Sequence, residues 1–239
     1  MRPLLLPCLL TVLVLAGCAT PVPDADAFSP APAAALAPDG HAWHDVALPG
    51  KDATQYRWTQ KDGRDALAAV SEQSASMYRR RVQRDGMALG DVSFSWWVQD
   101  LVAGGSVADA AREDAPARVL FGFGGDTSKL PARTRVMFEL AEALTGEIPP
   151  YATLMYVWDA QAPVGSVIVN PRSDRIRKIV VDSGPAELRR WRLHRRDLAA
   201  DFRLAFGEAP GALVSIAVMT DSDNTRSSAT SWYGPVDLH

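Results

Sequence analysis

The fold is indicated most clearly by the stretch Val92-Ser93-Phe94-Ser95-Trp96-Trp97-Val98. Apolar side chains alternate with small polar ones from Val92 to Trp96, which is the two-residue period of a β-strand with one face on a core. The adjacent residues Trp96 and Trp97 must point to opposite faces of such a strand. We therefore expect one of the two indole rings to lie outside the core that the other ring fills.

Short runs of the same kind lie on both sides of this stretch and are separated by turn residues. Strands are expected at residues 56–59, 66–75, 119–123, 153–158, 164–169, 176–182, 213–219 and 229–236. Helical spacing of apolar residues predicts helices at 131–145 and 197–206, each followed by a glycine that ends it. Many short strands with two short helical inserts predict a mainly β fold, a single jelly-roll-like β-sandwich.

The first 40 residues differ in composition from the rest of the chain. Residues 1–17 carry an apolar run that ends at Leu15-Ala16-Gly17-Cys18 and resembles a bacterial lipoprotein signal peptide, with Cys18 as the lipidated residue. Residues 18–40 are rich in proline and alanine, a composition typical of an extended tether. Residues 41–239 are expected to form the β-sandwich domain.

Composition and charge exclude several classes of function. The two cysteines, Cys8 and Cys18, precede the expected domain, which excludes a disulfide framework, a thiolate zinc site and a cysteine nucleophile there. The formal net charge of −3 argues against nucleic-acid binding, for which a strongly basic face is expected. Ala19 after Cys18 resembles the pattern of an outer-membrane lipoprotein. The expected location is therefore the bacterial cell envelope, with the domain anchored by lipid and facing the periplasm.

The run Asp221-Ser222-Asp223-Asn224-Thr225 is the sharpest polar cluster of the expected domain. Its oxygens suit a hard cation such as calcium, with Asp221 and Asp223 as candidate ligands. The same residues favour an Asx turn between two strands without any ligand, and the glycine and glutamate of helix-to-helix calcium loops are missing. The turn is the simpler interpretation of the two.

Other candidate ligand-binding residues lie near strand ends. The chain has seven tryptophans, and Trp158 or Trp232 would offer a flat face to a sugar ring if exposed. Asp126 follows Gly122-Phe123-Gly124-Gly125, which lacks the ending of a phosphate-binding loop, so no cofactor is expected. The candidate ligand-binding residues are Asp126, Trp158, Asp221, Asp223, Asn224 and Trp232.

Arginines form three clusters, at Arg79-Arg80-Arg81 and within residues 172–177 and 189–196. Guanidinium groups are planar, bidentate donors that suit lipid phosphate or an acidic glycan. The acidic balance of the chain favours partial neutralisation of these arginines by neighbouring Asp and Glu.

The sequence contains no catalytic motif. The Gly-x-Ser-x-Gly elbow is missing, and no catalytic residue is predicted. The leading hypothesis is non-catalytic binding of a glycan or another envelope component. One alternative is a hydrolase of envelope polysaccharides that uses Asp126 and Asp223 as paired carboxylates. The other is a lipoprotein scaffold that binds an envelope protein.

Several ordered segments together resemble one bacterial family, that of domain of unknown function 3047, over residues 43–239. They are Arg118–Phe123, Tyr151–Trp158, Asn170–Ser183, Arg196–Leu198, Phe206–Glu208, Met219–Thr225 and Trp232–Gly234. The resemblance implies an exported bacterial protein and supplies no active site. The closing strand, turn and strand are also similar to those of jelly-roll modules that bind galactose or other carbohydrates.

Overall fold

The structure, a computed structural model, describes residues 42–239. The expected signal peptide, the expected lipidation site Cys18 and the tether lie outside the described residues. The strands are β1 (His44–Ala47), β2 (Gln55–Lys61), β3 (Arg64–Glu72), β4 (Ala75–Arg84), β5 (Asp91–Val98), β6 (Arg118–Phe123), β7 (Ala152–Asp159), β8 (Val167–Asn170), β9 (Ser173–Ser183), β10 (Trp191–Asp197), β11 (Leu213–Asp221) and β12 (Ser228–Leu238).

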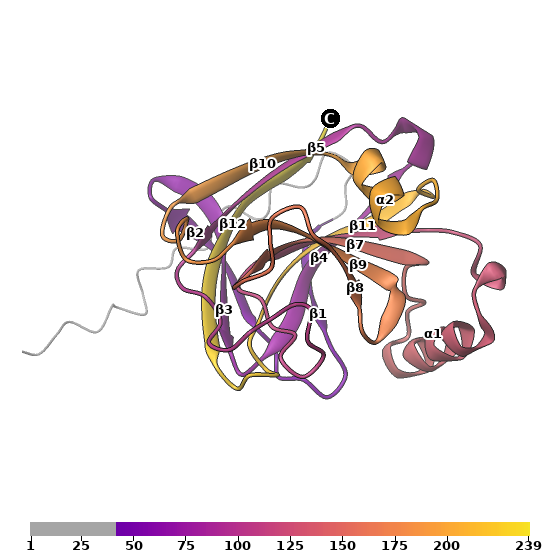
Figure 1. Cartoon of the computed structure of the whole chain (residues 1–239), viewed down its shortest axis with the longest axis horizontal. Helices are drawn as coiled ribbons and strands as arrows, with labels where there is room; N and C mark the ends of the chain where they lie inside the picture. The colour runs from indigo at the N-terminus through magenta and orange to yellow at the C-terminus, as the bar shows by residue number, and fades with distance from the viewer. Residues whose placement is uncertain (1–41) are drawn as a thin grey trace, which may run out of the picture.

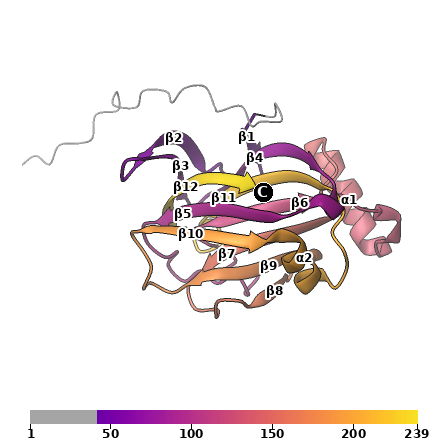
Figure 2. The same cartoon turned by 90° about the horizontal axis from the view of Figure 1, so that it is seen from above.

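The strands form two sheets that pack face to face (Figures 1 and 2). The larger sheet has seven strands in the order β1-β4-β11-β6-β7-β9-β8, and the smaller has five in the order β10-β5-β12-β3-β2. Within the described residues, β7 and β9 form the one parallel pair, and the other neighbours are antiparallel. The predicted fold class, a mainly β jelly-roll-like sandwich with two short helices, is confirmed.

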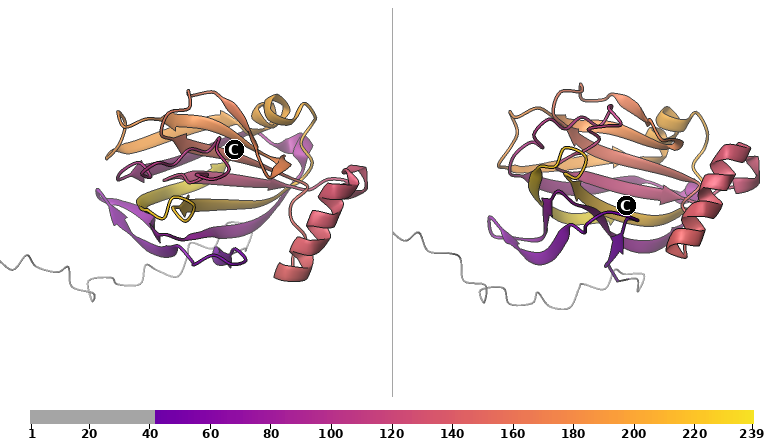
Figure 3. Two further views of the ribbon diagram at one scale, coloured as in Figure 1. Left: turned by 60° about the horizontal axis from the view of Figure 1, so that its bottom comes forward. Right: turned by 90° about the horizontal axis from the view of Figure 1, so that it is seen from below.

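The two helices begin and end where their capping residues place them. Helix α1 (Ala132–Thr145) follows Pro131 and ends at Gly146, whose φ of 74° is left-handed. Helix α2 (Leu198–Phe206) begins where the Asp197 carboxylate accepts a hydrogen bond from the Ala200 N–H. The helices differ in packing, because α2 buries residues against the sandwich whereas α1 buries none. Figure 3 shows α1 beside the end of the sandwich.

Strand alternation in β5 builds the main core between the sheets. Phe94 and Trp96 are buried there, and the Phe94 ring stacks on Tyr156 of the opposite sheet at 5.3 Å between centroids. Trp97 lies on the other face of β5, where its ring meets Trp232 edge-on at 5.0 Å, beneath the Lys61 ammonium. The expectation that Trp96 and Trp97 serve different faces is confirmed.

One strand assignment needs correction, and three further strand segments were not predicted. The strand expected at residues 66–75 is in fact the end of one strand and the start of the next, because β3 ends at Glu72 and β4 begins at Ala75 after a turn at Gln73. The remaining part of β4, together with β1 and β10, was not expected. Charged residues such as the arginines of β4 and β10 hide the apolar alternation on which strand prediction depends.

Residues 99–117 form a long loop that covers part of the outer face of the seven-stranded sheet. Its apolar residues Val107 and Ala115 pack on Leu120, Val157 and other residues of that face, which forms a second, smaller core. This 99–117 loop contains no helix or strand. The sequence patterns did not predict this layer, because a loop has no periodicity to read.

Buried charges hold the 99–117 loop on the sheet. The Arg118 guanidinium donates to both carboxylate oxygens of Asp221, at 2.9 and 2.8 Å, and to the carbonyl oxygen of Glu113 at 2.7 Å. The Lys178 ammonium lies 2.6 Å from both the Glu113 carboxylate and the carbonyl oxygen of Val107. Since Glu113 and Val107 belong to the loop, these ion pairs connect it to β6, β9 and β11.

The substitution Arg118→Met tests this arrangement. It leaves the Asp221 carboxylate buried without its cation and removes a hydrogen bond to the Glu113 carbonyl oxygen, so we expect the free energy of unfolding to fall by about 3–5 kcal/mol. Arg195→Met removes an exposed ion pair with Asp91 and should cost less than about 1 kcal/mol. Urea unfolding of both variants measures the difference, and equal losses would contradict the role of the buried network.

Candidate functional site

The Asp221–Thr225 cluster forms a turn held by the 99–117 loop. The Asp114 carboxylate accepts hydrogen bonds from the N–H groups of Asn224 and Thr225, and from both of their side chains, at 2.7–3.2 Å. Asp221 binds Arg118, and Asp223 forms an ion pair with Lys51. These contacts account for the polar residues of the turn without any ligand.

Carboxylate oxygens of Asp114, Asp221 and Asp223 lie within 4.8 Å of one another. Three carboxylates are a donor set of the kind that a hard cation prefers. Burial raises the pKa of Asp221 to about 6, against the lowering effect of the Arg118 guanidinium. A buried carboxylate whose two oxygens already accept hydrogen bonds from an arginine is a poor calcium ligand, so the turn interpretation agrees better with the structure.

The remaining candidates do not share a site. Trp158 is fully buried in the core and its indole N–H donates to the Gly184 carbonyl oxygen at 3.1 Å, so its ring presents no face to a sugar. Trp232 is half-buried on the outer face of the five-stranded sheet, packed on Trp97. Asp126 is exposed and accepts hydrogen bonds from the N–H and hydroxyl of Ser128.

The proposed pairing of Asp126 with Asp223 is wrong. Strands β6 and β11 run antiparallel, with Phe123 opposite Leu213 and Arg118 opposite Met219. Asp126 therefore follows one end of this pair of strands and Asp223 follows the other. The strand between the two ends spans about 17 Å, whereas glycosidase carboxyl groups lie within about 10 Å. These two carboxylates cannot act on one glycosidic bond.

A cleft of about 520 Å³ lies on the outer face of the seven-stranded sheet, at the end away from the 99–117 loop. Strand β4 contributes Arg79 and Arg81, and β11 contributes Val214 and Ser215. The other lining residues come from the connections on either side of α1 and from α1 itself: Gly124, Gly125, Thr127, Glu142, Gly146, Glu147, Ile148, Pro149, Pro150 and Tyr151. Helix α1 and its flanking segments therefore form one wall of the cleft.

Small residues at the base of the cleft allow the neighbouring segments to pack closely. Gly122 lies opposite Ser215 in the sheet, and a Cβ atom there would lie 2.3 Å from the Ser215 hydroxyl and 2.8 Å from Pro150. A Cβ atom on Gly125 would lie 2.4 Å from the Tyr151 ring. The glycines of this segment therefore allow close packing around the cleft.

One carboxylate bridges the two arginines of the cleft. Glu147 accepts a hydrogen bond from Arg79 at 2.7 Å on one oxygen and from Arg81 at 2.8 Å on the other. The hydrogen bond from Arg79 is the largest effect and lowers the pKa of Glu147; burial opposes it, and the hydrogen bond from Arg81 lowers the pKa further. Glu147 is therefore ionised at neutral pH.

Arg79 and Arg81 belong to an arginine cluster that the sequence analysis noted as suited to lipid phosphate or an acidic glycan, but neither they nor Glu147 were among the candidate ligand-binding residues. The sequence contained a signal for the arginines, because Arg79 and Arg81 are two positions apart and a strand places such residues on one face. Recognising that signal required recognising β4. Glu147 has no such signal, since its position depends on how the segment after α1 returns to the sheet. The expected neutralisation of arginines by carboxylates is observed here.

The fold and the cleft define the class of protein: a jelly-roll-like β-sandwich with an open site on its larger sheet. Within that class, the chain belongs to the DUF3047 family, described as a protein of unknown function, whose model matches residues 41–237. No protein of curated function matches the sequence. Within the described part of the chain, neither helix has the length and apolar character that crossing a membrane requires.

Several solved structures are distantly similar to the chain. The endoglucanase Cel12A of Rhodothermus marinus is 9% identical with a TM-score of 0.44, covering 84% of this chain and 94% of its own. The xyloglucanase domain of NopAA from Sinorhizobium fredii is 11% identical with a TM-score of 0.43 (89% and 99% covered). A family 11 carbohydrate-binding module of Clostridium thermocellum is 9% identical with a TM-score of 0.40 (82% and 87% covered). Similarities this distant carry no argument about function.

The pKa of Glu147 gives a prediction for the cleft. A lowered pKa means that the bridge stabilises the folded protein above the ordinary pKa of glutamate, about 4.3, and is lost as the pH falls through the lower value of the folded state. In an NMR titration, the Glu147 carboxyl carbon should have its midpoint below about 4.3.

The variant Arg79→Met provides the comparison for this titration. Loss of the first hydrogen bond should move the Glu147 midpoint upward, while Arg81 still holds one oxygen. A midpoint at or above about 4.3 in the unmodified protein, or one that Arg79→Met leaves in place, would show that the bridge does not form.

Proposed function

We propose that the protein binds a glycan or another polar component of the bacterial envelope in the cleft beside α1, without catalysing a reaction. The single observation that carries the proposal is the cleft itself, whose volume of about 520 Å³ lies within the ordinary range for ligand sites. Arginine, glutamate, serine and threonine side chains line it together with glycine backbone. These groups can pair with the many hydroxyls of a sugar chain.

The carboxylates of the cleft favour binding over hydrolysis. Glu142 and Glu147 both line it, but a glycosidase acid must keep its proton near neutral pH through a raised pKa. The pKa of Glu147 is shifted in the opposite direction by the two arginines. Glu147 is therefore unsuited to protonate a leaving sugar.

A second candidate function is protein binding through α1. Its residues Val136, Met137, Leu140 and Leu144 are each at least half exposed, and no residue of the helix is buried. Contiguous exposed apolar side chains are more typical of an interaction surface than of solvent-facing helix. This observation supports the scaffold alternative independently of the cleft.

The predicted location is part of the proposal and rests on the sequence of the first 19 residues. Attachment through a lipid on Cys18, followed by the proline- and alanine-rich tether, would hold the sandwich domain at the outer membrane on its periplasmic side. An envelope glycan would then be within reach of the cleft.

Thr127→Trp tests the binding function. Thr127 is exposed and lines the cleft, so an indole ring there should obstruct ligand entry without disturbing the core. We expect the full chain to bind at least one class in a panel of envelope oligosaccharides, and the variant to bind it at least about tenfold more weakly, measured by isothermal titration calorimetry.

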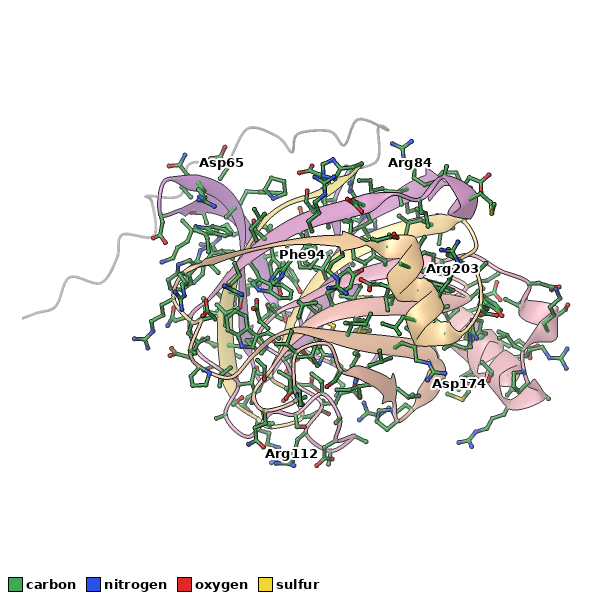
Figure 4. The ribbon with its side chains drawn as sticks, turned by 45° about the horizontal axis from the view of Figure 1, so that its top comes forward. Asp65, Arg84, Phe94, Arg112, Asp174 and Arg203 are labelled. Atoms are coloured by element: carbon green, nitrogen blue, oxygen red, sulfur yellow. The ribbon has the colours of Figure 1, made fainter. Side chains whose placement is uncertain are left out.

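The matched control is Asp65→Trp. Asp65 is also exposed and lies on the β2–β3 hairpin, at the opposite end of the molecule from α1 (Figure 4). This variant should bind like the unmodified protein. Equal weakening by both substitutions, or none by Thr127→Trp, would place the ligand elsewhere, and a folded protein that binds no oligosaccharide of the panel would overturn the proposal.

Cys18→Ala tests the location. Because the lipid would be attached through the Cys18 sulfur, the variant should incorporate no labelled fatty acid in growing cells and should lose its membrane attachment. Cys8→Ala removes the other cysteine and should leave labelling unchanged. Fatty-acid labelling that survives Cys18→Ala would rule out this anchor.

A further inference from the structure

We infer that Arg79 and Arg81 form a recognition site for the carboxylate of an acidic sugar, and that Glu147 occupies this site until such a ligand displaces it. The inference rests on the proposed function and names its ligand class: a glycan that carries uronic-acid residues or a comparable carboxylated sugar.

The sheet itself fixes the spacing of the two arginines. Arg79 and Arg81 are two residues apart in β4, so both lie on the outer face, while Val82 of the same strand is in the main core. On the neighbouring strand, Arg79 pairs with Ala217 and Arg81 with Ser215. Because these neighbours are small, the long arginine side chains can lie across the sheet toward the cleft.

Glu147 shows what shape of anion this pair accepts. Its two carboxylate oxygens are shared between the arginines, with Oε2 2.7 Å from Arg79 and Oε1 2.8 Å from Arg81. The carboxylate of a sugar has the same two oxygens at the same spacing, so it can replace Glu147 with both hydrogen bonds preserved. The Arg79 Nε is buried without a hydrogen-bond partner in the described structure, which leaves a donor for a ligand to use.

The segment that carries Glu147 lies at the surface of the molecule, and none of residues 132–150 is fully buried. It follows α1, which has no buried residue, and Gly146 immediately before it adopts a left-handed φ of 74°. The side chains of Glu147 and Arg81 are 40% and 61% exposed, whereas that of Arg79 is 14% exposed, so the half of the bridge that Arg81 forms is the more easily exchanged. Exposed ion pairs contribute little to stability, so a ligand carboxylate can displace Glu147 at small cost.

The aromatic ring of the cleft explains why an ionic anchor is needed. Tyr151 is the aromatic residue among the described lining residues. The Arg175 guanidinium stacks on its ring at 4.1 Å, and Gly125 packs against the ring as well. Because Arg175 and Gly125 already pack against the Tyr151 ring, the ring is poorly placed to stack on a sugar, and polar groups must supply the affinity. Two fixed guanidinium groups are the strongest such groups in the cleft.

Calorimetric titration of the full chain with oligogalacturonate and with a neutral galactan oligosaccharide of equal length tests the inference. We expect the acidic oligosaccharide to bind at least tenfold more tightly. Arg81→Gln should remove most of that preference, because it should weaken binding of the acidic sugar much more than binding of the neutral one. Glu147→Gln should tighten binding of the acidic sugar severalfold, because the internal competitor loses its charge.

Two further variants serve as matched controls. Arg84→Gln removes an exposed arginine three residues further along β4, outside the cleft lining, and Glu139→Gln removes an exposed carboxylate of α1 that does not line the cleft. Both should bind the acidic sugar like the unmodified protein. Circular dichroism of each variant confirms that it is folded.

The outcomes separate the two proposals. Equal affinity for acidic and neutral sugars, or a preference that survives Arg81→Gln, would overturn the inference and leave the glycan-binding function standing. Weaker acidic binding in Glu147→Gln would show that Glu147 is part of the site and not its competitor. Failure of every oligosaccharide to bind would overturn the proposed function and the inference together. Inorganic phosphate that competes as well as galacturonate would show general anion binding instead of carboxylate recognition.

Discussion

The buried ion pairs of Arg118 and Lys178 are the constraint on which the outer face of the larger sheet depends. They hold the 99–117 loop against β6, β9 and β11 through Asp221 and Glu113. The loop covers one end of this face and supplies Val107 and Ala115 to the second core. The end that it leaves uncovered is where the cleft lies, bordered by β4, β11 and the segments around α1.

The same face thus combines two kinds of charge. At the covered end, charges are buried and fully engaged with one another, so removal of one partner leaves another uncompensated. At the open end, Glu147 and the two arginines are partly exposed. We therefore expect the fold to depend on the first group, and we propose that the second group binds a ligand.

Much of the fold could be predicted from the sequence, because periodicity and capping are local. The alternation around Phe94 identified the core strand, and Gly146 and Gly207 marked the ends of both helices. Strands β4 and β10 were missed where arginines replaced the expected pattern. The site could not be predicted, since Arg79, Ser215 and Glu147 come together only through strand order and the return of the chain after α1. The prediction that Trp158 binds a sugar was wrong because an aromatic residue near a strand end can face the core as readily as solvent.

We propose that a ligand binds in the cleft beside α1, and not on the tryptophan-bearing face of the smaller sheet. Backbone amide chemical shifts recorded by NMR during titration with oligogalacturonate test it most directly. If the ligand binds in the cleft, the amide shifts of residues 79–81, 124–127, 146–151 and 214–215 should change. Changes that instead cluster around Trp97, Trp191 and Trp232, on adjacent strands of the five-stranded sheet, would contradict it.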